Sequence, residues 1–79
     1  MKELIIKFSP FILKQIVFIK DGDKITEERV SQKDLAKFIA SQTNVSKIHF
    51  FGNEDYAKKI AAEFITKYKV TNVEILFNI

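Results

Sequence analysis

The chain has 79 residues, 47% of them hydrophobic, with no cysteine and a net charge of +3 to which both halves contribute. This length predicts one domain, residues 1–79, with a small core, because so short a chain buries only ~60–65% of its unfolded surface. The composition excludes a disordered tail and a collagen-like chain, and the missing thiols exclude disulfide bonds and a zinc finger.

The first part of the chain predicts a meander of strands. Residues 2–8 alternate apolar and polar side chains, which is typical of a strand. Residues 12–20 form a second run, rich in β-branched side chains. The pair Asp21-Gly22 then indicates a short hairpin loop. Residues 24–30 return as a polar strand, which suits the edge of a sheet.

Two later segments predict amphipathic helices. The first, residues 31–43, begins at Ser31, with Asp34 three residues later as a variant of the capping box. The second, residues 53–69, begins at Asn53, a favoured N-cap residue. The spacing of apolar residues predicts a core on these helices made of Leu35, Phe38, Ile39, Ile60, Ala61 and Phe64.

Strands at residues 45–51 and 73–79 complete the order β-β-β-α-β-α-β. A hairpin followed by two right-handed crossovers has few packings. We predict a single α/β (α+β) domain with a five-stranded mixed sheet in order 3-2-1-4-5 and both helices on one face. This order resembles that of ribonuclease-H-like folds, in topology alone and without any shared motif, so it implies no activity. A ferredoxin-like arrangement is the alternative.

No catalytic constellation emerges from the residues. Ribonuclease-H-like enzymes hold two magnesium ions with clustered carboxylates. Here only Glu3 lies on the first strand, and Glu54 and Asp55 fall in a first helical turn, where acidic residues are ordinary. His49 has no second histidine and no cysteine with which to bind a metal. We therefore predict a protein that is not an enzyme, with no catalytic residue, cofactor or metal.

The most informative feature is that the strands are apolar on both sides although both helices are expected on one face. Strands of this kind normally have both faces buried. The uncovered face would present a large apolar patch, a candidate protein-interaction face. The residues expected there are Ile5, Val17, Ile19, His49 and Phe51. The alternative is that residues 9–13 fold over part of this face.

A second candidate surface is basic. It consists of lysines on neighbouring strands, namely Lys2, Lys7, Lys14 and Lys20. With Phe11 or Phe18 beside them, these lysines would suit a single-stranded nucleic acid. The chain has one arginine, which argues against reading of base edges, and lysines often decorate sheet edges. Nucleic acid is therefore the alternative partner.

We expect a non-catalytic macromolecule-binding module that forms a homodimer or binds another protein through its uncovered face. Its size and its lysine-rich and isoleucine-rich composition resemble those of accessory and regulatory proteins of phages and mobile elements. No run of 18 apolar residues occurs, which predicts no membrane partner. Lysines interrupt the apolar N-terminal stretch, which argues against a signal peptide, so the expected location is the cytoplasm.

Overall fold

The computed structural model describes residues 1–8, 14–69 and 72–78. Its elements in chain order are β1 (Lys2–Lys7), β2 (Lys14–Asp21), β3 (Lys24–Ser31), the 3-10 helix η1 (Gln32–Asp34), α1 (Leu35–Ser41), β4 (Val45–Phe51), α2 (Glu54–Lys67) and β5 (Glu74–Asn78). The five strands form one sheet in the order β3-β2-β1-β4-β5. β1 is antiparallel to β2 and parallel to β4, which is parallel to β5. The predicted fold class is confirmed.

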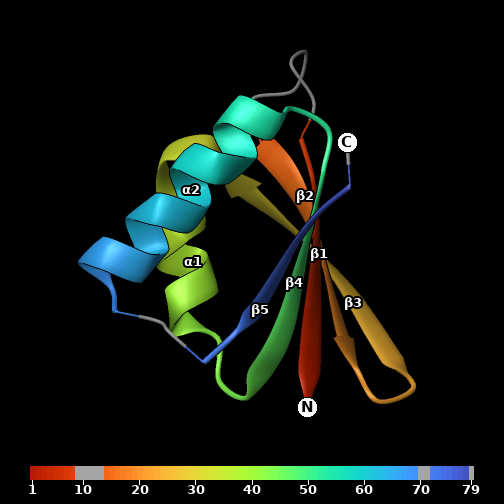
Figure 1. Cartoon of the computed structure of the whole chain (residues 1–79). Coiled ribbons are helices and arrows are strands. Elements are labelled where there is room, and N and C mark those ends of the chain that lie inside the picture. The colour runs from red at the N-terminus through yellow and green to blue at the C-terminus, as the bar shows by residue number, and fades with distance from the viewer. Residues whose placement is uncertain (9–13, 70–71, 79) are drawn as a thin grey trace.

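The molecule has two layers. α1 and α2 lie side by side on one face of the sheet (Figure 1). β3 and β5 form the two edges of the sheet. β3 is exposed along almost its whole length, as expected for a polar edge strand. The helices therefore cover a sheet whose middle strands are β2, β1 and β4.

The core lies between the helices and the sheet. Leu4, Ile6, Ile48 and Phe50 are fully buried side chains from the middle strands. Among the residues predicted for the helix side of this core, those that are buried are Leu35, Ile39, Ile60, Ala61 and Phe64. The remaining one, Phe38, is half-buried and packs against the same cluster. The expected amphipathic faces of both helices therefore do point at the sheet.

The helix starts follow the sequence signals only in part. Asn53 caps α2, because its Oδ1 accepts a hydrogen bond of 3.1 Å from the backbone N–H of Tyr56. Ser31 does not cap η1, which follows it, since its hydroxyl donates to the carboxylate of Asp34 at 2.7 Å. These two side chains bond to each other instead of accepting backbone N–H groups. The expected capping box is absent there, and η1 precedes a short α1 of 7 residues.

Aromatic rings link the end of the sheet to α2. Phe50 of β4 stacks with Phe77 of β5 at 5.6 Å between ring centres and with Phe8 at 5.9 Å. Phe8 stacks in turn with Tyr56 of α2 at 6.4 Å. This row lies on the helix side of the sheet, where it extends the core toward the carboxyl ends of the parallel strands.

Candidate interaction face

One face of the sheet is covered by the helices, and no helix or strand of the described residues covers the other, which we call the open face (Figure 1). Alternate residues of a strand point to it, and directly paired residues of neighbouring strands point to the same face. Leu4 and Ile6 of β1 are fully buried in the core. Ile5, which lies between them, therefore points to the open face.

An apolar strip, made of Phe18, Ile5, His49, Leu76 and Phe51, crosses the open face. Ile5 pairs with Phe18 of β2 and with His49 of β4, and His49 pairs with Leu76 of β5. These four residues are only half-buried. Phe51 of β4 is 37% exposed, and its ring stacks with that of His49 at 6.3 Å. The strip is therefore an apolar surface that solvent reaches.

Two of the residues predicted for this face lie on the other one. Val17 is fully buried, and Ile19 packs against the core. The reason is the strand register, because Val17 pairs with Ile6 and Ile19 pairs with Leu4. Both partners face the helices, so the prediction for Val17 and Ile19 is wrong. The other residues predicted for the open face do lie on it: Ile5, His49 and Phe51.

Sequence reasoning missed Ile16 and Phe18, which take the places of the two misassigned residues. Both alternating series of β2 are apolar, so alternation alone does not reveal which series faces the helices. A usable signal is present in the flanking residues. Lys14 and Lys20 share the phase of Ile16 and Phe18, and lysine is almost never fully buried. The series that ends in lysines is the one that faces solvent.

One border of the apolar strip carries a carboxylate between cations. Glu3 of β1 lies between Lys20 of β2 and Lys47 of β4, with N···O distances of 3.9 Å to each. The same carboxylate lies 3.9 Å from Nε2 of His49. These side chains are 22% to 48% exposed. Water screens such pairs, so each contributes little to stability.

The opposite border of the strip is basic. Lys7 of β1 holds its ammonium group 5.4 Å from the ring centre of Phe18. Arg29 of β3 pairs with Ile16 of β2 and is exposed, as Lys7 is. Lys14, the first residue of β2, alternates in phase with Ile16 and therefore points to the same face. The open face thus has a carboxylate at the middle of one border, and at the other border it has the cations Lys7 and Arg29 with Ile16 between them.

The four lysines of the predicted basic patch are not brought together. Lys2 precedes Glu3 and points to the opposite side of the sheet, because strand side chains alternate. Lys20 pairs with Glu3, whereas Lys7 and Lys14 lie at the other border of the open face. A continuous patch of all four lysines is therefore not formed.

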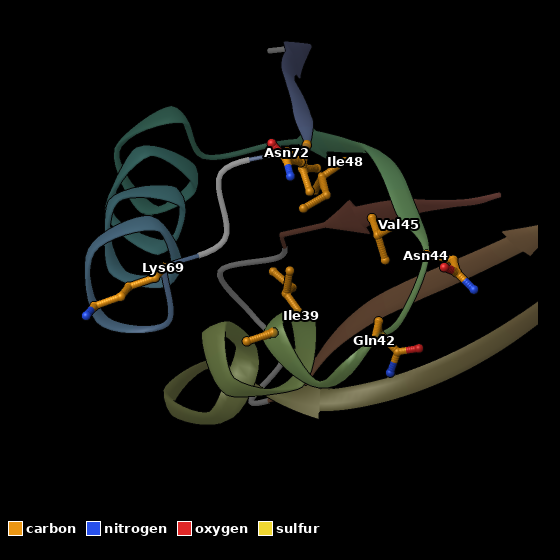
Figure 2. A pocket seen from close by; sticks show the side chains of 9 residues that line it. Ile39, Gln42, Asn44, Val45, Ile48, Lys69 and Asn72 are labelled. Carbon is orange, nitrogen blue, oxygen red and sulfur yellow. The ribbon is translucent and has the colours of Figure 1, made fainter.

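A hollow of about 290 Å³ lies where β4 begins, beside the end of α1 (Figure 2). Its apolar floor includes Ile39, Val45 and Ile48, and amide side chains such as Gln42 stand at its rim. Figure 2 shows the side chain of Lys69 pointing away from this floor. The volume is at the lower limit for small-molecule sites. Neutral amides and an apolar floor are common to many kinds of binding site. The hollow therefore does not indicate one class of ligand.

The carboxylates considered for a nuclease site lie apart. Glu3 is near the start of β1, whereas Glu54 and Asp55 follow the end of β4. Because β1 and β4 are parallel, these groups lie at opposite ends of the sheet. Glu54 accepts a hydrogen bond from Lys58 at 2.9 Å, which raises the pKa of that lysine. In the part of the chain that the structure describes, no three histidine or acidic side chains are grouped to hold a metal ion.

Neither described helix has both the length and the apolar content to cross a membrane. The longer one, α2, has 14 residues, whereas a transmembrane helix needs about 20. No protein-family model, curated protein or solved structure matches this chain. What the protein does is therefore inferred from the geometry of its open face.

Proposed function

We propose that this protein is a non-catalytic binding module that pairs with another protein through its open face, and that its first partner is a second copy of itself. The apolar strip is the observation that carries this proposal. Burial of apolar surface contributes roughly 25 cal/mol per Å². Solvent-accessible apolar patches with a polar rim are typical of interaction sites. The charged borders of the strip supply such a rim.

The test compares substitutions at two sites of equal exposure. Phe51 on the open face is 37% exposed, and Ile65 on α2 is 38% exposed. We expect Phe51→Lys to abolish self-association, because an interface that buries this side chain would leave its ammonium group without a carboxylate partner. Ile65→Lys should retain the wild-type mass. Light scattering distinguishes a dimer from a monomer of 9.2 kDa.

The outcome of this comparison can contradict the proposal in two ways. A wild-type protein that stays at 9.2 kDa up to about 100 micromolar would not self-associate in the range that small interfaces provide. Equal masses of the Phe51→Lys variant and the wild type would place any interface elsewhere. Circular dichroism of both variants checks that the folded state persists.

A single-stranded nucleic acid is the alternative partner, and one contact favours it. The ammonium group of Lys7 lies over the ring of Phe18, with Arg29 on the neighbouring strand. Cations beside aromatic rings suit phosphates and stacked bases. Binding of this kind must weaken steeply as salt rises. Retention on single-stranded DNA at low salt that is lost in Lys7→Ala would support this alternative.

The wider role that we propose is that of an accessory or regulatory protein of phage or mobile-element type acting in the cytoplasm. Small size and a lysine-rich and isoleucine-rich composition support it. In this role the open face would occupy a surface of the target protein. Purification of the tagged protein from its own cells, followed by identification of its partners, tests this role.

A further inference from the structure

The strand registers arrange the open face in three rows that run across the strands. The Glu3 row contains Ile25, Lys20, Glu3, Lys47 and Glu74. The Ile5 row contains Glu27, Phe18, Ile5, His49 and Leu76. The Lys7 row contains Arg29, Ile16, Lys7 and Phe51. Ile5 lies at the centre of this grid, with Glu3 and Lys7 on either side of it along β1.

We infer that two copies pair face to face about a two-fold axis that runs across the strands along the Ile5 row. This inference rests on the proposed function. The Glu3 row of one copy then lies over the Lys7 row of the other. Two-fold dimers bury the same patch on both subunits. The axis therefore decides which residues of that patch meet.

Charge complementarity selects this axis over the other axis that lies in the plane of the face. With the axis across the strands, Glu3 faces Lys7 of the second copy, and this attractive pair occurs twice. With the axis along β1, Glu3 would face its own counterpart, Lys7 would face its own counterpart, and Lys20 would face Lys47. Like charges placed together in an interface suppress an alignment. Only the first axis pairs opposite charges at the centre.

The apolar strip fits the same axis. Phe18, Ile5 and Leu76 of the Ile5 row each meet their own counterpart, so apolar side chains contact apolar side chains across the interface. Phe51 of the Lys7 row lies over Lys47, which allows contact between a cation and a ring. With the axis along β1, Leu76 would instead face Glu27. The preferred axis therefore keeps Leu76 away from Glu27, which instead meets its own counterpart on the exposed edge strand β3, away from the centre of the interface.

The open face is small for a dimer interface. Five strands spaced ~4.8 Å apart and three rows of side chains give a flat footprint of about 500 Å². Stable interfaces bury about 800 Å² per partner. The area that this face could bury is therefore small, even when the extra surface of protruding side chains is counted. We expect association in the micromolar range, where a few charge pairs can decide the alignment.

Charge reversal tests the axis. We expect Glu3→Lys and Lys7→Glu each to weaken self-association about tenfold or more, because each turns two attractive contacts into repulsive ones. The double variant carrying both changes should associate as the wild type does. Analytical ultracentrifugation over about 1–100 micromolar measures all four proteins in the range expected of a small interface.

The results separate the axis from the proposed function. Single variants that associate as strongly as the wild type, or a double variant that is not restored, would overturn the axis while self-association stands. A monomeric wild type would instead overturn the proposed function on which the axis rests. Thermal melts of the single variants check folding, since Glu3 also contacts Lys20 and Lys47 within its own chain.

Cross-linking supplies a measurement that does not depend on charge. The chain has no cysteine, so a single introduced thiol reacts alone. His49→Cys should be cross-linked to its counterpart by a short bismaleimide, because the inferred axis places these positions opposite each other across sheets packed ~10 Å apart. Lys7→Cys should react poorly, because it faces Glu3. The reverse pattern would support the axis along β1 and overturn the inference.

Discussion

At the scale of single residues, Gly52 lies where the backbones of β1 and β4 approach each other closely at the end of the sheet. It follows Phe51 and has a φ of 106°. A Cβ at this position would lie 2.7 Å from the carbonyl oxygen of Phe8. The backbone N–H of Phe8 donates to the carbonyl of Phe51 at 2.9 Å. Glycine thus permits β1 and β4 to stay in contact beyond their last paired residues.

We expect Gly52→Ala to lower the free energy of unfolding by about 3 kcal/mol, from backbone strain and the close contact with Phe8. The matched control is Gly22→Ala in the hairpin loop. Gly22 also has a positive φ, 63°, but a Cβ added there would meet no atom within 4 Å. That variant should lose only about 1 kcal/mol. Urea unfolding measures both, and equal losses would show that the contact with Phe8 is unimportant.

At the scale of elements, the helix starts differ in how their first N–H groups are satisfied. The Asn53 side chain accepts a backbone N–H at the start of α2, whereas the Ser31 hydroxyl donates to Asp34 and makes no cap bond at the start of η1. We therefore expect Asn53→Ala to lower the free energy of unfolding by about 1 kcal/mol. Ser31→Ala, the control, should change it by less than about 0.5 kcal/mol. Thermal melts give both values, and a larger effect at Ser31 would contradict this assignment.

The same scale shows what the sequence could predict. Local signals located the elements, such as the N-cap at Asn53, which starts α2. The hairpin loop was displaced by one residue, because the strands end at Asp21 and resume at Lys24. For β2, the wrong side chains were predicted to lie on the open face. Both alternating series of β2 are apolar and fit the local pattern equally well, so pairing with β1 decides which series faces the helices.

At the scale of the whole molecule, the two-layer fold followed from element order, because few connections of this order are allowed. The open face followed from the same order, since both helices lie on one side of the sheet (Figure 1). The rows of charge across that face could not be predicted, because they depend on the register of all five strands. A one-residue slip in any strand would exchange its two faces.

Association should couple to the stability of the whole molecule. A dimer that forms only from folded chains is stabilised by mass action, so its melting temperature rises with protein concentration. For a domain of this size we expect a rise of about 5–10 °C over a hundredfold range above the dissociation constant. Phe51→Lys should melt at one temperature throughout that range, because it has no dimer to stabilise. Gly22→Ala should melt lower than the wild type and keep the full concentration dependence, because its change lies outside the open face. Calorimetry at matched scan rates measures these shifts, and a wild-type melting temperature independent of concentration would contradict self-association.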